Sequence, residues 1–253
     1  MMRLHRMPLR RLFAVKLLLA VAVFGAVTPL RAAFINLTPS NGVNSSSSVL
    51  LSDLISGEVM GVTVGDKIFT GFNYSFMGDM PQAIDVQVLG FKDQNGNWGV
   101  TFHGTFHDLP GGSTSDAMIR FVVDIDPNFL RQGYRISDAH LFMNGYGVGA
   151  DSALMVDESF LESNQSMHVY TSSINGGGTQ NSDWVYFDPT LSTLHVVKDI
   201  FAMASNNSIL PARATVIDQS FSQIIVPEPA AGLLMLCGIT CLGFARKRHR
   251  LER

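Results

Sequence analysis

Apolar and polar positions alternate along most of the chain between residues 59 and 225. The alternating runs are rich in Val, Ile, Phe and Thr and are separated by Gly, Asn and Asp, a pattern typical of half-buried β-strands joined by turns. It predicts strands at residues 59–64, 67–76, 83–92, 97–107, 116–125, 134–144, 153–158, 166–172, 183–188, 193–200 and 213–225. Residues 59–226 are therefore predicted to form an all-β domain, either a β-sandwich or a jelly-roll-like body.

Turn-forming residues mark the connections between these strands. Residues 93–97 (DQNGN) predict a hairpin turn, because Asn-Gly pairs favour tight reversals. The apolar residues expected to face inward on either side of it are Ile84, Val86, Val88, Phe91, Trp98, Val100, Phe102 and Phe106. Residues 176–178 (GGG) predict a mobile loop. Residues 34–58 read as a polar lead-in, with the serine-rich stretch 38–48 more typical of a linker than of a strand.

The first 33 residues have the pattern of a signal peptide. Basic residues precede the uncharged apolar run LLLAVAVFGAV at residues 17–27. At about 1.5 Å per residue, this run is too short to cross about 30 Å of hydrocarbon as a helix. We expect cleavage after Ala33, with Ala32 and Ala26 as alternatives, although Arg31 occupies a position where a small residue is usual.

The last 27 residues have three consecutive parts. Pro227, Glu228 and Pro229 precede the uncharged apolar segment 230–245, and the basic tail 246–253 follows. A helix over the apolar segment would rise about 24 Å and barely span a bilayer. The basic residues that would stop it on the cytoplasmic side are Arg246, Lys247 and Arg248. A C-terminal transmembrane helix is therefore predicted, with the rest of the chain outside.

This order of motif, short apolar helix and basic end resembles the PEP-CTERM sorting signal of bacterial surface proteins. The resemblance covers residues 227–253, roughly a tenth of the chain. It implies recognition by the membrane enzyme exosortase, cleavage near residues 227–229, and an inner-membrane intermediate before release to the cell surface or medium. It also names exopolysaccharide as a candidate partner, since such bacteria make it. An ordinary single-span anchor is the alternative.

Three phrases within the body also resemble proteins that carry this signal. They are residues 64–69 (VGDKIF), 196–200 (VVKDI) and 217–223 (IDQSFSQ). The resemblance implies a shared β scaffold rather than an activity.

The charge distribution fits export and argues against nucleic acid as a partner. Residues 34–229 contain 20 Asp and Glu but only seven Lys and Arg, so phosphate groups would be repelled. The only cysteines, Cys237 and Cys241, lie in the apolar segment of the tail. The body therefore has no disulfide framework and no thiol for catalysis.

Two groups of residues were weighed as metal sites. His103 and His107 could share one face of a strand, but a closed site needs three or four ligands. Residues 124–128 (DIDPN) begin like a calcium loop, yet Phe129 replaces the required glycine and Arg135 stands where the bidentate acid belongs. A turn capped by Asp and Asn is the better interpretation, and no metal or cofactor is predicted.

No catalytic residue is assigned. Asp157, Glu158 and Glu162 could form an acid–base group, but sequence spacing does not test the carboxylate separation that glycoside hydrolysis requires. The nucleophile elbow, phosphate-binding loop and zinc-protease helix are all missing from the sequence.

Three functions remain open at this point. The first is a non-catalytic surface or matrix protein, the second a carbohydrate- or calcium-binding β-sandwich, and the third a secreted hydrolase. Exposed aromatic residues on one sheet face would favour the second. The aromatic residues expected to line such a groove are Trp98, Trp184, Tyr146 and Tyr186.

Overall fold

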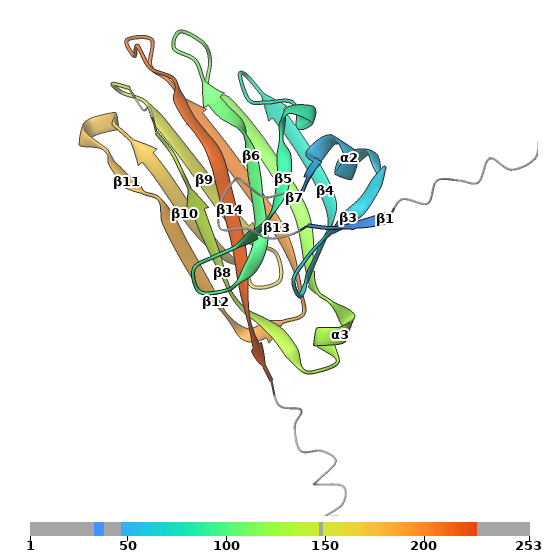
Figure 1. Ribbon diagram of the computed structural model, residues 1–253. Helices are drawn as coiled ribbons and strands as arrows, with labels where there is room; N and C mark the ends of the chain where they lie inside the picture. The colour runs from blue at the N-terminus through green and yellow to red at the C-terminus, as the bar shows by residue number, and fades with distance from the viewer. Residues whose placement is uncertain (1–32, 38–46, 147–148, 227–253) are drawn as a thin grey trace, which may run out of the picture. The chain divides into compact units, whose positions relative to one another are not determined.

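The computed structural model describes residues 33–37, 47–146 and 149–226. These residues form two β-sheets that pack face to face (Figure 1). Aromatic rings from the two sheets meet in the core: Phe69 lies 6.1 Å from Phe221, and Phe102 lies 5.7 Å from Phe121. The predicted two-sheet β-fold is confirmed.

The larger sheet has eight strands in the order β1-β3-β4-β7-β13-β9-β10-β11. Its first pair, β1 and β3, is parallel, and the other neighbours are antiparallel. The bounds are β1 Ala33–Asn36, β3 Val59–Val64, β4 Lys67–Met77, β7 Ser115–Ile125, β13 Thr193–Met203, β9 Ala153–Phe160, β10 Gln165–Ser172 and β11 Gly178–Gln180.

The smaller sheet has six strands in the order β12-β8-β14-β6-β5-β2, all antiparallel. The bounds are β12 Ser182–Leu191, β8 Tyr134–Met143, β14 Ala212–Ile225, β6 Trp98–Asp108, β5 Gln87–Lys92 and β2 Ser48–Leu50. The last strand of the chain, β14, is inserted between β8 and β6. This insertion brings distant parts of the sequence onto one face.

Within the described ranges, four short helical segments connect the strands. They are α2 Leu51–Ser56, η1 Ala83–Asp85, α3 Pro127–Leu130 and η2 Ile174–Gly176. The predicted capped turn at residues 124–128 is confirmed, because the Asp126 side chain accepts a hydrogen bond of 2.8 Å from the Asn128 N–H at the start of α3. Pro127 occupies the first turn of α3, where its missing N–H costs nothing.

Strict alternation along the strands places the core between the sheets. In β7, Ala117, Ile119, Phe121, Val123 and Ile125 are all buried, whereas the residues between them are more exposed. Burial of such side chains from both sheets provides the main driving force for folding.

Two lysines are fully buried in this core and reach from the larger sheet to β14. Lys67 Nζ donates to Asp66 Oδ1 at 2.8 Å and to Gln223 Oε1 at 2.9 Å. Lys198 Nζ contacts the Glu158 carboxylate and donates to Gln219 Oε1 at 2.9 Å. A buried lysine head group needs such partners, because a polar group removed from water is costly unless it is hydrogen-bonded.

The predicted strands agree closely with the observed ones, with several corrections. The start of predicted strand 83–92 is the helical turn η1, and Ile84 is exposed rather than inward-facing. Phe91 is not inward-facing either, because it lies beside Gly99 on the outer face of the smaller sheet. Gly176 and Gly178, predicted to lie in a loop, belong to η2 and to the unpredicted strand β11. The lead-in is also more structured than expected, since β1, β2 and α2 belong to the folded body and Leu51 and Leu54 are buried. Residues 38–46 of that stretch lie outside the described residues.

Both predicted terminal signals lie outside the described part of the chain, apart from Ala33. No helix within the described ranges is long and apolar enough to span a bilayer. The apolar segment 230–245, the motif at residues 227–229 and the basic tail belong to the residues that are not described.

Candidate carbohydrate-binding groove

The two histidines share a face but do not form a metal site. His103 and His107 both lie on the outer face of β6, and His107 Nδ1 is 2.9 Å from the Thr105 carbonyl oxygen. Among the residues that the structure describes, no three His, Cys, Asp or Glu side chains are placed together to hold a metal ion.

The three candidate acid–base residues are separated. Asp157 contacts His168 on the outside of the larger sheet at 2.5 Å, and Glu158 points into the core toward Lys198. Glu162 pairs with His195 on the surface. Because neighbouring residues of a strand face opposite sides, Asp157 and Glu158 do not share a site.

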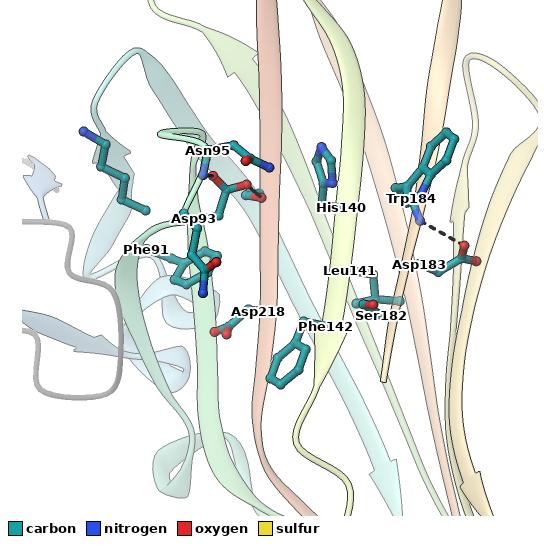
Figure 2. A pocket seen from close by; sticks show the side chains of 13 residues that line it. Phe91, Asp93, Asn95, His140, Leu141, Phe142, Ser182, Asp183, Trp184 and Asp218 are labelled. Atoms are coloured by element: carbon teal, nitrogen blue, oxygen red, sulfur yellow. Dashed lines mark hydrogen bonds between the residues drawn. The ribbon is translucent and has the colours of Figure 1, made fainter. Parts of the chain in front are cut away.

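A groove of about 610 Å³ lies on the outer face of the smaller sheet (Figure 2). One wall is the β5–β6 turn, residues 91–95, and the other is the beginning of β12, residues 182–184. Between them, β8 and β14 provide a floor that includes His140, Phe142 and Asp218. In Figure 2 these floor residues lie between Phe91 and Asp93 on one side and Trp184 on the other.

Strand register explains why these residues form one row. Backbone pairing places Trp184 beside His140, and His140 beside Ser220. In the same way, Ser220 lies beside Gly99 on β6, and Gly99 lies beside Phe91 on β5. Four strand spacings separate the two aromatic ends, a span of about 19 Å.

The middle of this row consists of small residues, which do not project far above the sheet. A Cβ atom on Gly99 would lie 1.8 Å from the backbone oxygen of Gln219, so no larger residue fits without moving β14. Ser220 is the only other residue of the row between β6 and β8. The groove is therefore hollow where the sheet has almost no side chains.

Asp93 fixes the turn that forms the first wall. Its Oδ1 accepts from the N–H groups of Asn95 and Asn97 at 2.9 Å, and its Oδ2 accepts from Asn97 Nδ2 at 2.8 Å and Ser220 Oγ at 2.9 Å. Burial alone would raise the pKa of Asp93, but these hydrogen bonds outweigh it and hold the pKa below its ordinary value. The predicted hairpin turn is confirmed, and Asp93 ties it to β14.

Two ionisable groups on the floor have shifted pKa values. Burial raises the pKa of Asp218 to about 6, although a hydrogen bond from Thr101 and the charge of Lys198 oppose the shift. The pKa of His140 is raised, mainly by its hydrogen bond of 2.9 Å to Asp138 Oδ1. Asp218 therefore becomes charged only as pH rises through about 6, and His140 keeps its proton to a higher pH than an ordinary histidine does.

The second wall presents the most exposed aromatic surface of the groove. The Trp184 side chain is 57% exposed and meets the 61% exposed Tyr186 edge-on, with ring centroids 4.7 Å apart. Both side chains lie on the outer face of β12, because they pair with the outward-facing His140 and Asp138.

The other two aromatic candidates lie elsewhere. Trp98 packs against the core and carries Lys92 Nζ 4.4 Å above its ring. Tyr146 stacks under the guanidinium of Arg213 at 4.6 Å, beyond the lining of the groove. Of the four predicted residues, only Trp184 lines the groove, and Tyr186 packs against it from outside that lining.

Sequence reasoning missed His140, Phe142, Asp183 and Asp218. A signal was present in β8, where Asp138, His140 and Phe142 follow one another at every second position of a strand. Nothing local indicated that Asp218 would lie beside them, since it is adjacent to β8 only through strand pairing.

Two smaller hollows are found on the same sheet. One of about 190 Å³ is lined by Asp85, Gln87, His103, Gly104, Thr105 and Thr215. A second of about 450 Å³ is lined by residues 79–82 together with Asp85, Thr105 and His107. The two histidines considered as metal ligands therefore line surface hollows near a neighbouring loop.

Comparison with protein families gave no match, and comparison with curated proteins gave none either. Among solved structures, the mannan-recognising carbohydrate-binding module TmCBM27 is similar with a TM-score of 0.30 and 12% identity, covering 70% of this chain and 94% of that one. TmCBM61, solved with β-1,4-galactotriose, gives 0.26 and 10%, covering 60% and 88%. The enzymatically active domain of bacteriophage CBA120 tailspike protein 4 gives 0.26 and 12%, covering 60% of this chain but only 19% of that one. With TM-scores this low, these likenesses do not bear on the ligand.

Proposed function

We propose that the β-sandwich binds an uncharged carbohydrate chain, and that it does so as the binding domain of an exported surface protein. The observation that carries the proposal is Trp184, a large aromatic side chain that is 57% exposed at the edge of a polar groove. Together with Tyr186, Trp184 forms an exposed aromatic pair, and aromatic residues are typical of ligand-binding surfaces.

The composition of the groove suits a sugar. A pyranose ring presents an apolar face of C–H groups, which can pack on Trp184, and a rim of hydroxyl groups. Side-chain amides that can bind those hydroxyls line the same groove, namely those of Gln94 and Asn95. Three acidic residues, Asp93, Asp183 and Asp218, line it with only Lys92 and His140 as basic partners, so an anionic polysaccharide would be repelled.

Binding is favoured over hydrolysis because the carboxylates already have partners. Asp93 accepts four hydrogen bonds within its turn and from Ser220. Asp183 accepts from the backbone N–H groups of His168 and Trp184, and Asp218 accepts from Thr101. A catalytic acid and base would need free oxygen atoms facing the substrate.

Delivery to the surface is the second part of the proposal and rests on the two ends of the sequence. Residues 1–33 would direct export, and residues 227–253 would be recognised by exosortase after residues 230–245 enter the membrane. A carbohydrate-binding body delivered in this way would be held in the exopolysaccharide layer, which makes that polymer the first candidate ligand.

The experiment is a binding measurement with Trp184→Ala. Binding of the purified protein to a panel of neutral and anionic polysaccharides, including the exopolysaccharide of the producing cells, is followed by affinity electrophoresis and calorimetry. We expect neutral polymers to bind and the variant to lose about 2 kcal/mol, roughly a 30-fold weaker Kd.

Phe76→Ala is the matched control, because Phe76 is also an exposed aromatic residue, 47% accessible, but lies on β4 of the other sheet. It should bind like the unaltered protein. Equal binding by both variants and the unaltered protein, or no binding to any polysaccharide, would contradict the proposed function.

A further inference from the structure

Three side chains in the core form a dry cluster that joins the two sheets. Lys198 and Glu158 are directly paired neighbours on β13 and β9, and Gln219 reaches them from β14 of the opposite sheet. Lys198 and Gln219 are 0% exposed, and Glu158 is 1% exposed. None of these three residues lines the groove described above.

Burial shifts the pKa values of Lys198 and Glu158 in the directions that an acyl transfer requires. Burial lowers the pKa of Lys198, against the opposing effect of Glu158, and so favours the neutral, nucleophilic amine. Burial also raises the pKa of Glu158, which favours the protonated acid. A neutral amine beside a carboxylic acid is a nucleophile with its proton carrier in place.

Gln219 provides the acyl group. Its Oε1 accepts a hydrogen bond of 2.9 Å from Lys198 Nζ, so the amide carbon Cδ lies one bond beyond that contact. Its Nε2 is buried and has no hydrogen-bond partner among the described residues, and the same holds for Glu158 Oε1. An orphaned buried amide nitrogen is unfavourable, and a reaction that expels it as ammonia would remove the defect.

We propose that Lys198 and Gln219 become joined by an intramolecular amide bond, with Glu158 carrying the proton. The lone pair of Nζ attacks Cδ and forms the Nζ–Cδ bond. Glu158 Oε2, which contacts Nζ, takes the proton that the amine loses, and Glu158 Oε1 gives the acid proton to Nε2. This transfer brings together Glu158 Oε1 and Gln219 Nε2, which both lack a partner beforehand within the described part of the chain. The Cδ–Nε2 bond breaks, and ammonia leaves. One amide replaces another, so no oxidant, reductant or further reactant is needed, and Glu158 ends in its starting state.

A second buried lysine shows what is special about this cluster. Lys67 Nζ also donates to a β14 glutamine, Gln223 Oε1, at 2.9 Å and pairs with Asp66 at 2.8 Å. Gln223, however, is partly exposed, so water can hydrate its amide and charged groups beside it. Of the two lysine–glutamine contacts, only Lys198–Gln219 is fully buried and also has an amide nitrogen without a partner among the described residues.

The cross-link has a structural rationale in an exported protein. Residues 34–229 contain no cysteine, so disulfides cannot stabilise this domain. A bond between β13 and β14 would tie one sheet covalently to the other and restrict the unfolded chain as a disulfide does.

The test is tandem mass spectrometry of protease digests of the full chain. We expect one linked pair of peptides, joined at Lys198 and Gln219 and lighter by about 17 Da, the mass of ammonia, than the sum of the two. Lys67 and Gln223 should be recovered unlinked in the same digest. Glu158→Gln keeps the volume of the cluster but removes the proton carrier, so its digest should contain free Lys198 and Gln219 peptides.

Three results would overturn the proposal. They are Lys198 and Gln219 peptides found unlinked in the unaltered protein, a loss of about 18 Da that maps to a Lys198–Glu158 bond, and an equal bond between Lys67 and Gln223. The result from the unaltered protein decides the matter even if Glu158→Gln fails to fold.

Discussion

At the scale of single residues, Asp218 lines the proposed binding groove and also has a pKa that burial shifts. It lies on the groove floor, and burial raises its pKa to about 6, from a model-peptide value of 3.8. Between these values the folded protein holds a proton that the unfolded chain releases. The free energy of unfolding should therefore fall as pH rises from about 4 to 6, and then level off.

Asp218→Asn should remove the contribution of Asp218 to this dependence, whereas that of Asp199, whose pKa burial also raises to about 6, should remain. Asparagine has the same size, stays neutral and can still accept the hydrogen bond from Thr101. We expect the variant to gain up to about 3 kcal/mol at pH 7.5 and little at pH 4, as measured by urea unfolding at both values. The exposed Asp85→Asn should behave like the unaltered protein. If Asp218→Asn were less stable at both pH values, the carboxylate would be required in its charged form.

At the scale of elements, the groove is a product of the β5–β6 hairpin and the edge strand β12. They stand on either side of strands whose outer faces carry Gly99 and Ser220. The span of about 19 Å between the two walls corresponds to four strand spacings. A carbohydrate chain that crosses the sheet would therefore touch both walls only if it were several sugars long.

Affinity should consequently depend on chain length. A hexose adds about 5 Å, close to one strand spacing, so Kd should tighten up to about four units and then stay constant. Linear β-1,4-linked gluco-, manno- and galacto-oligosaccharides of one to six units, titrated by calorimetry, provide the test. Equal affinity for the monosaccharide and the longer chains would show that only one wall is used.

At the scale of the whole chain, an acidic body lies between two basic ends. Residues 34–229 hold 20 of the acidic residues and only seven of the basic ones. The basic groups would remain on the cytoplasmic side of a membrane while the body is exported. The two lysine-bearing phrases, residues 64–69 and 196–200, contact the single glutamine-bearing phrase, residues 217–223, through Lys67 with Gln223 and Lys198 with Gln219. These contacts give the resemblance a packing role.

Replacing Pro227 and Pro229 by Ala should trap the protein in the inner membrane. Proline restricts its own φ and disfavours a helix at the preceding residue, so these two residues would keep the motif accessible to a protease. As a transmembrane helix, segment 230–245 would barely span a bilayer. Mass analysis of envelope and medium, with and without exosortase, is the measurement. An intact chain ending at Arg253 in both strains would show that the tail is only an anchor.

Particular residues show which parts of the fold the sequence predicts correctly. The alternation in β7 and the DQNGN turn predicted their structures correctly, since both are local properties of a few neighbouring residues. The same reasoning placed Ile84 inward, where a helical turn exposes it. It also described the stretch before β3 as a lead-in, because α2 is too short to show a helical period.

The sequence by itself determined that the body is built of β-strands with one apolar and one polar face. It also placed Trp184 and Tyr186 on the same face of one strand. The residues of the two predicted terminal signals likewise follow from the sequence alone. Periodicity and order along the chain suffice for these conclusions. The tertiary structure alone decided that β14 lies between β6 and β8, and hence that Trp184 faces Phe91 across Ser220. It also decided that Lys198 meets Glu158 and Gln219 in the core. Those contacts join strands that are distant in the chain, and their pairing depends on how the whole set of apolar faces is buried together.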